Sequence, residues 1–286
     1  MDSRSGNTEK VARLDVQLHP SLKQDDLPIQ IFMWLETSNY LNRLEANQFD
    51  IFTQKFHKSV SKTFDHFKGR IVRQENNTYL VLFTSVTNAV LCALKIQANY
   101  KYITPKVFPG DRKLKIGISA AKAEKKSNKS MPEVITRVSR MCAVVEGELI
   151  ITSAIKRAYE QENKNALIDQ ELIRTLKQWE ERFLDQLMEY IEKSWNTPNF
   201  SVSKMSAEMG WSKSQLYRKL IKLTGKSPNT FIREYRLQRA LGLLHKGFGN
   251  VSKIASESGF RSPSYFSKCF LDKFGILPSK YAKQHI

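Results

Sequence analysis

The pattern of apolar and polar positions between Val202 and Ile286 occurs twice in succession. The block MSAEMGW, residues 205–211, is matched by IASESGF, residues 254–260, and each is followed by a stretch rich in serine, aromatic and basic residues. The apolar residues of both stretches keep the spacing of a buried helical stripe, namely Leu216, Leu220 and Leu223 in the first copy and Phe266, Phe270 and Phe274 in the second. A repeat of roughly 50 residues predicts two copies of one helical unit.

Each copy has the signals of two helices joined by a tight turn. Gly210 and Gly259 stand where the chain must reverse, a position that favours positive φ. Ser212 and Ser262 follow at the N-cap position of the next helix. A short helix with an apolar back and a basic front is what a helix-turn-helix presents to the DNA major groove. The repeat therefore predicts two such units.

The segment from near Glu180 to the end resembles the DNA-binding domain of the AraC/XylS family of bacterial transcription regulators. The resemblance rests on SGFRSPSYFSKCFLDKFGILPSKYAKQ in the second copy and on REYRLQRALGLL, which corresponds to the family's connecting helix. It implies promoter DNA and RNA polymerase as partners. By position in the family's reading helices, the residues that face base edges are Ser214, Tyr217 and Arg218, then Ser264, Ser267 and Lys268; Lys213 and Lys222 add to the basic front of the first helix.

The pattern before residue 161 is of a different kind. Residues 1–27 are polar with little periodicity, which predicts a mobile arm. The segment 28–160 then predicts strands and helices in the order β-α-β-β-α-β-α-β, with Gly69 ending the first helix and a hairpin turn at residues 75–77. This order is that of a ferredoxin-like α+β sandwich, in which helices cover one face of a largely antiparallel sheet.

Four stretches follow one another in this segment, namely GRIVRQENNTYLVLF, SVTNAVLCALKIQ, LKIGISAA and VITRVSRMCAVVEGELIITSAI. By these stretches, residues 28–159 resemble the catalytic domain of the class III adenylate and guanylate cyclases. That family holds two metal ions with two carboxylates. The first carboxylate should lie in the opening strand, where this chain has only Glu36 nearby, and the second should lie where Asn77 stands. Thr136 replaces the family's ribose-orienting asparagine, whereas Arg140 matches its phosphate-binding arginine and is a candidate anion contact. The resemblance therefore implies a cyclase-type fold that has lost its catalytic residues.

The role of this domain has more than one interpretation. It can sense a small molecule or nucleotide, or it can serve only for dimerisation, since cyclase-type domains generally pair head to tail. The alternative from another class is a residual or heterodimeric cyclase fused to a DNA-binding domain. The missing carboxylates favour a regulator without enzyme activity, the resemblance implies a homodimer, and no metal or cofactor is expected.

A helical linker is predicted over residues 161–180, before the DNA-binding domain at 181–286. Its apolar stripe continues into the next domain and comprises Leu172, Leu176, Trp179, Phe183, Leu187 and Tyr190. Such a stripe can pack within its own chain or against a second copy. On the second reading, charged substitutions at Leu176 and Phe183 should uncouple the two halves without unfolding either.

Composition agrees with a DNA-binding protein of the cytoplasm. The formal net charge is +18, which favours a polyanionic partner without locating its site. The three cysteines are widely separated and are expected to be reduced core residues. The polar N-terminus predicts no signal peptide, and no apolar run is long enough to cross a bilayer. We therefore expect a cytoplasmic bacterial regulator that is associated with the nucleoid through DNA.

Overall fold

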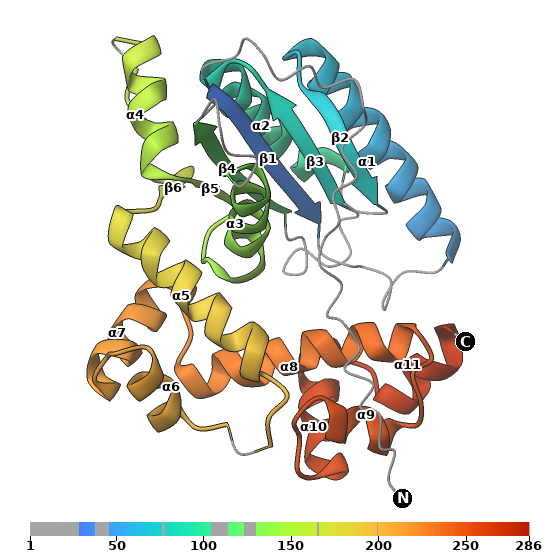
Figure 1. The fold of residues 1–286 in the computed structure, drawn as a ribbon. Coiled ribbons are helices and arrows are strands. Elements are labelled where there is room, and N and C mark those ends of the chain that lie inside the picture. The colour runs from blue at the N-terminus through green and yellow to red at the C-terminus, as the bar shows by residue number, and fades with distance from the viewer. Residues whose placement is uncertain are drawn as a thin grey trace, which may run out of the picture.

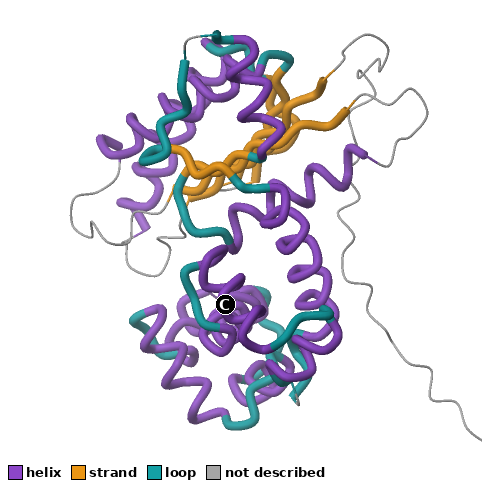
Figure 2. Tube along the Cα trace, turned by 90° about the vertical axis from the view of Figure 1, so that its left-hand side faces the viewer, coloured by secondary structure: helices purple, strands orange, loops and turns teal. Residues whose placement is uncertain are grey.

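The computed structural model describes residues 29–37, 46–75, 78–103, 114–122, 130–164, 166–198 and 200–285. The predicted arm over residues 1–27 lies outside these ranges. Strands occur only in the first part of the described chain, and the part after residue 176 is helical (Figure 2). The prediction of an α+β part followed by an all-α part is confirmed.

One mixed sheet forms the centre of the first part. Its strands are β1 (Ile29–Thr37), β2 (Arg70–Glu75), β3 (Thr78–Phe83), β4 (Leu114–Lys122), β5 (Leu149–Ile151) and β6 (Ile173–Thr175). They lie in the order β2-β3-β1-β4-β5-β6 (Figure 1). Strand β1 pairs antiparallel with β3 and β4, whereas β5 pairs parallel with β4 and β6. The predicted hairpin of β2 and β3 is confirmed.

Helices cover both faces of this sheet. Helices α1 (Ala46–His66), α2 (Val86–Ile103) and α4 (Ser153–Glu162) contribute to the core that contains Met33 and Leu35 of β1. Helix α3 (Ser130–Val144) packs on the other face, against Phe32 and Trp34 (Figure 1). The expectation of helices on one face is wrong because successive side chains of β1 are apolar, and each face needs a cover.

The end of α1 is set by a different residue from the one predicted. Lys68 has the positive φ, at 58°, and Gly69 does not. Gly69 is required for space instead, because an added Cβ would lie 2.6 Å from the ring of Phe83. The glycine therefore marks the close approach of the chain to β3.

The predicted helical linker over 161–180 contains a strand. Ile173–Thr175 form β6, and the Leu176 amide then donates to the Ile151 carbonyl at 2.8 Å. Helix α5 (Gln178–Ser194) begins only after this strand. The helical prediction is wrong here because Ile173 and Leu176 are buried by pairing with the sheet, while Leu172 is 48% exposed.

The remaining helices are α6 (Val202–Glu208), α7 (Lys213–Thr224), α8 (Pro228–His245), α9 (Val251–Glu257), α10 (Pro263–Phe274) and α11 (Pro278–His285). Helix α8 spans the helical part, with α6 and α7 near one end and α9, α10 and α11 near the other (Figure 1). Its first half contributes Phe231 and Ile232 to one core, and its second half contributes Leu237 and Leu241 to another.

Helix α5 joins the sheet domain to the first of these cores. One apolar cluster contains Val138 of α3, Phe183 and Leu187 of α5, and Leu220 of α7. The α5 stripe thus packs within its own chain. Charged substitutions at Leu176 or Phe183 would disrupt this core, because the two side chains are 0% and 1% exposed, so the expectation that they leave both domains folded is wrong.

Carboxylates on α5 add polar contacts with the sheet domain. Asp185 receives two hydrogen bonds from Arg137, and Glu192 receives two from Arg140. Glu181 accepts from both the amide and the hydroxyl of Ser153. These contacts are spaced along α5, so they fix its direction as well as its distance from α3 and α4.

The C-terminal end of α7 also contacts the sheet domain directly. The Glu146 amide donates to the Leu223 carbonyl at 3.0 Å, and Arg174 Nη2 donates to the Lys222 carbonyl at 2.7 Å. These carbonyls belong to the last turn of α7, which lacks intrahelical partners. Residues of the sheet domain therefore complete the hydrogen bonding of this helix.

We expect Leu187→Ala to lower the free energy of unfolding by about 2–5 kcal/mol, because it opens a cavity in the core shared by α3, α5 and α7. Leu167→Ala is the matched control. Its side chain is 89% exposed, so the change should be within about 0.5 kcal/mol. Urea unfolding of the full chain measures both, and equal small losses would contradict this packing.

Candidate nucleic-acid interface

The first helix-turn-helix unit comprises α6, a short turn and α7. Gly210 in the turn has φ 70°, as its predicted role requires. The Ser212 hydroxyl accepts from the Gln215 amide, and the Gln215 side chain accepts from the Ser212 amide. Gly225 ends α7 in the left-handed conformation. These signals fix both ends of α7 by local chemistry.

The second unit repeats this construction with α9 and α10. Gly259 has φ 75°, the Ser262 hydroxyl accepts from the Tyr265 amide, and Gly275 ends α10 in the left-handed conformation. The predicted turn and N-cap roles in both units are thus confirmed. Helices α7 and α10 begin and end at equivalent positions, so their surface residues can be compared one by one.

Each of the two helices has a buried back and an accessible front. Leu216 and Leu220 of α7 are fully buried, as are Phe266 and Phe270 of α10. Tyr217 is 47% exposed. Most of the predicted DNA-contacting residues are likewise exposed: Lys213, Ser214, Tyr217, Arg218 and Lys222 on α7, and Ser264 and Lys268 on α10.

Arg218 and Lys268 occupy equivalent positions on the two fronts. Within the described part of the chain, neither side chain takes part in a hydrogen bond or an ion pair. An exposed cation without an internal partner is available to an acceptor on another molecule. A guanidinium can bind the O6 and N7 atoms of guanine with two hydrogen bonds.

Two of the predicted DNA-contacting residues also make contacts within the chain. Ser267 is half-buried, and its hydroxyl donates to the Pro263 carbonyl at 2.9 Å, which leaves it to act as an acceptor. The Lys222 ammonium lies 5.4 Å from the ring centroid of Trp179 at the start of α5. Both stay predicted contacts, and Lys222 also takes part in the junction with the sheet domain.

Lys219 contributes to this junction and not to the exposed front. Its ammonium lies 4.2 Å from the ring centroid of Trp211 and 4.3 Å from that of Trp179. Cation–π attraction of this kind stabilises a partly buried ammonium. Lys219 thus holds the back of α7 against α5.

Tyr265 is a candidate contact that the sequence reasoning missed. It lies in the first turn of α10, one turn before Lys268, and is 51% exposed. Its ring centroid is 6.3 Å from that of Phe260, which supports the ring from one side. Its place in the repeat, opposite Gln215, is the signal that could have identified it.

The positions expected to correspond to cyclase catalytic residues are only partly described, because Asn77 lies outside the described residues. The Glu36 carboxyl accepts from Trp34 Nε1 at 3.0 Å, and burial raises its pKa, an effect that Trp34 and Lys115 partly oppose. Arg140 donates to Glu192 through Nε at 3.1 Å and Nη2 at 2.7 Å, so an anion would have to displace this carboxylate. In the described ranges, histidine, cysteine and carboxylate side chains form no group of three or more that could bind a metal ion.

Two further expectations concern the cysteines and the membrane. Cys92, Cys142 and Cys269 are buried free thiols, as predicted. Among the helices that the structure describes, none combines the length and apolar character that a bilayer-spanning segment requires.

The two turn glycines allow a matched test of the units. Gly210→Ala should cost about 1–2 kcal/mol, because it only places a side chain at positive φ. Gly259→Ala should cost about 1 kcal/mol more, because its Cβ would lie 2.9 Å from the Arg236 guanidinium, which donates to the carbonyls of Trp195 and Thr197. Thermal unfolding of the two variants compares them, and an equal loss would contradict the packing of Arg236 beneath this turn.

Comparison with known proteins places the repeat in a family. Residues 205–284 match the model of a helix-turn-helix domain family. The chain is 38% identical to "Histidine kinase P4" of Formosa agariphila over 111 residues, 39% of this chain and 8% of that protein. It is 32% identical to the "HTH-type transcriptional regulator MtrA" of Neisseria gonorrhoeae over 139 residues, 47% of this chain and 43% of that protein. The chain thus spans less than half the length of either relative.

A solved structure also aligns with about half of the chain. The guanylyl cyclase domain of RhoGC from Blastocladiella emersonii covers 48% of this chain and 86% of its own length, with 10% identity and a TM-score of 0.37. This similarity is too weak to assign a fold to the N-terminal part. The family match, by contrast, covers the turns of both units together with helices α7 and α10. Residues 205–284 are therefore a double helix-turn-helix domain, as the resemblance to AraC-type regulators predicted.

Proposed function

We propose that this chain is a sequence-specific DNA-binding transcription regulator whose two units read one promoter site. The observation that carries the proposal is the pair of equivalent helices, each with a buried back and an exposed basic front at Arg218 or Lys268. The family match and the regulator among the relatives support it. The net charge of +18 favours the same partner.

The contacts divide into those that specify and those that position. Arg218 and Lys268 are placed to read bases, with Ser214, Tyr217 and Ser264 beside them. Helix α8 connects the units, so α7 and α10 should enter successive major grooves about one turn, roughly 34 Å, apart on one face of the DNA. Lysines such as Lys213 would contact phosphates, which makes binding salt-dependent.

We expect Arg218→Ala to weaken binding to the preferred site by about 1–3 kcal/mol and to relax the base preference there. Arg182→Ala is the matched control, since it removes the same charge from an exposed position on α5. Fluorescence anisotropy with the preferred duplex and with random DNA measures both variants. An equal loss on the two duplexes would mean that Arg218 only holds phosphate.

We further propose that the N-terminal domain is a cyclase-like domain without catalytic activity, which senses a ligand or mediates dimerisation. The resemblance in sequence and the order of strands and helices support the fold. The substitution by Asn77 and Thr136 supports the loss of chemistry, because an amide oxygen is a weaker metal ligand than a carboxylate. RNA polymerase is the second partner and the bacterial cytoplasm the location that the resemblance implies.

The purified chain should form no cyclic nucleotide from ATP or GTP with magnesium or manganese, because Asn77 stands where a metal-binding carboxylate is needed. Liquid chromatography with mass spectrometry detects the product at high protein concentration. Arg140→Ala serves as the control for a contaminating enzyme. Product that disappears in this variant would favour the alternative, a residual or heterodimeric cyclase fused to a DNA-binding domain.

The same resemblance implies a homodimer formed through residues 28–160. Two copies would place two DNA-binding domains within reach of repeated sites and raise apparent affinity through effective concentration. We expect the full chain to sediment as a dimer in analytical ultracentrifugation at tens of micromolar. This concentration is about 10–100 times the dissociation constant of a dimer that forms with micromolar affinity. A monomer at that concentration would leave ligand sensing as the role of this domain.

A further inference from the structure

The two helix-turn-helix units have separate cores, and among the helices that the structure describes only α8 contributes to both. Phe231 and Ile232 belong to the core of the first unit, whereas Leu237 and Leu241 belong to that of the second. The change occurs within about one turn of α8. Apolar packing therefore fixes each unit on α8, but it does not by itself fix the two units against each other.

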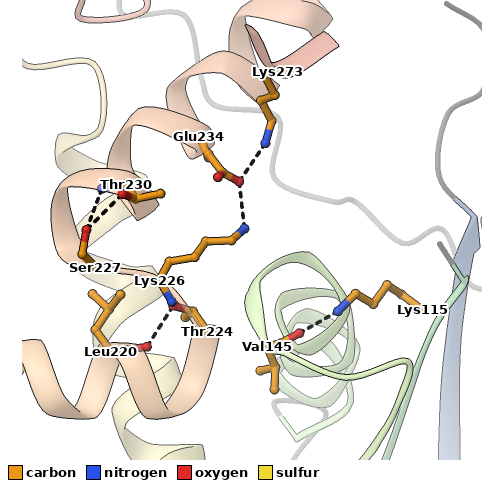
Figure 3. Close-up of polar contacts among 9 residues, drawn as sticks. All are labelled: Lys115, Val145, Leu220, Thr224, Lys226, Ser227, Thr230, Glu234 and Lys273. Carbon is orange, nitrogen blue, oxygen red and sulfur yellow. Dashed lines mark hydrogen bonds and ion pairs between the residues drawn. The ribbon is translucent and has the colours of Figure 1, made fainter. Parts of the chain in front are cut away.

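Glu234 lies on α8 at the point where the cores change. Its Oε2 atom accepts from Lys226 Nζ at 2.8 Å and from Lys273 Nζ at 2.7 Å (Figure 3). Lys226 follows Gly225, which ends α7, and Lys273 lies in the last turn of α10. One carboxylate oxygen thus joins the C-terminal ends of the two reading helices.

The contact depends on the charge of the Glu234 carboxylate. Two ammonium groups that share one oxygen repel each other, and an ionised carboxylate between them offsets this repulsion. Burial alone would raise the pKa of Glu234, but hydrogen bonds from Lys226 and Lys273 lower it to about 2, so the group is charged at neutral pH. The three side chains are only 27–41% exposed, which strengthens the contact relative to an open surface pair.

The loop before α6 is held by residues near the same turn of α8. Arg236 donates to the carbonyls of Trp195 and Thr197 at 2.6 and 2.9 Å, and Arg261 from the second turn donates to the Pro198 carbonyl at 3.3 Å. These bonds also connect the first unit with the second. The polar contacts between the units therefore converge around one turn of α8.

We propose that Glu234 is a positioning residue, which sets the relative orientation of α7 and α10 and thereby the spacing of the two grooves that one chain can read. This deepens the proposed function and, for its DNA part, rests on it. Glu234 itself contacts no base in this account. It acts by holding Lys226 and Lys273 together.

The first experiment measures orientation without DNA. Nitroxide labels at Ser203→Cys and Ser252→Cys, exposed and equivalent positions on α6 and α9, report the distance between the units, and the native cysteines are buried. Pulsed electron–electron double resonance should give one narrow distribution of label-to-label distances for the parent. The same is expected for Glu189→Gln, a control whose ion pair lies within α5. Glu234→Gln should broaden or shift the distribution. An unchanged distribution overturns the proposal.

The second experiment measures DNA binding. On a DNA site that keeps the preferred bases in both grooves, Glu234→Gln should bind about tenfold more weakly than the parent. The reason is that a misoriented second unit has a lower effective concentration at its groove. On a DNA site in which the bases of one groove are randomised, the affinity of the variant should be unchanged or higher, because the variant has gained net positive charge. Simple electrostatics predicts tighter binding to both sites, and that result would overturn the proposal.

The two experiments separate this proposal from the proposed function. If the parent shows no sequence preference at all, the DNA-reading function fails while the distance measurement still decides the role of Glu234. Should Glu234→Gln not fold, Lys273→Gln removes only the contact to the second unit and should broaden the same distance distribution. A narrow distribution in that variant would equally overturn the proposal.

Discussion

The packing of α5 between α3 and α7 is the constraint on which the rest of the structure depends. Its apolar side chains belong to one buried cluster with the sheet domain and with the first reading helix, and its carboxylates bind Arg137 and Arg140. Large buried side chains in such a core each contribute about 2–5 kcal/mol, so α7 cannot move far relative to the sheet without breaking this packing. A ligand or second subunit on the N-terminal domain would therefore act on the first unit through α5. The apolar stripe that could have served as a dimer seam is used within the chain.

The second unit is attached by different means. It has its own core and meets the first unit through α8 and through the polar contacts of Glu234, Arg236 and Arg261. The ion pairs of Glu234 with Lys226 and Lys273 are sensitive to salt and to the approach of a phosphate backbone, whereas the apolar packing around α5 is not. If the chain reads DNA as proposed, it combines one helix fixed to the N-terminal domain with a second whose orientation depends on electrostatics.

The sequence was informative wherever local chemistry decides structure. Gly210 and Gly259 stand at turn positions with positive φ, and the hydroxyls of Ser212 and Ser262 accept from free amides at the starts of the next helices. Both units could therefore be predicted from residues only a few positions apart. It failed where distant residues decide. Strand β6 exists because Ile173 finds a place beside β5, and nothing in its own spacing distinguishes it from the helix that follows. Contacts between Glu234 and Lys273, or between Arg236 and Trp195, join residues too far apart for any periodicity to reveal. Tyr265 was missed because the predicted contacts followed the family's base-facing positions, and Tyr265, opposite Gln215, is not one of them.

We propose that a single chain reads DNA with both units. Hydroxyl-radical footprinting of the full chain on its best genomic site tests this most directly, because each unit should protect the backbone on either side of the major groove that it enters. We expect two protected regions about one helical turn apart on the same face of the duplex. Protection at a single groove, or uniform protection that does not depend on sequence, would contradict it.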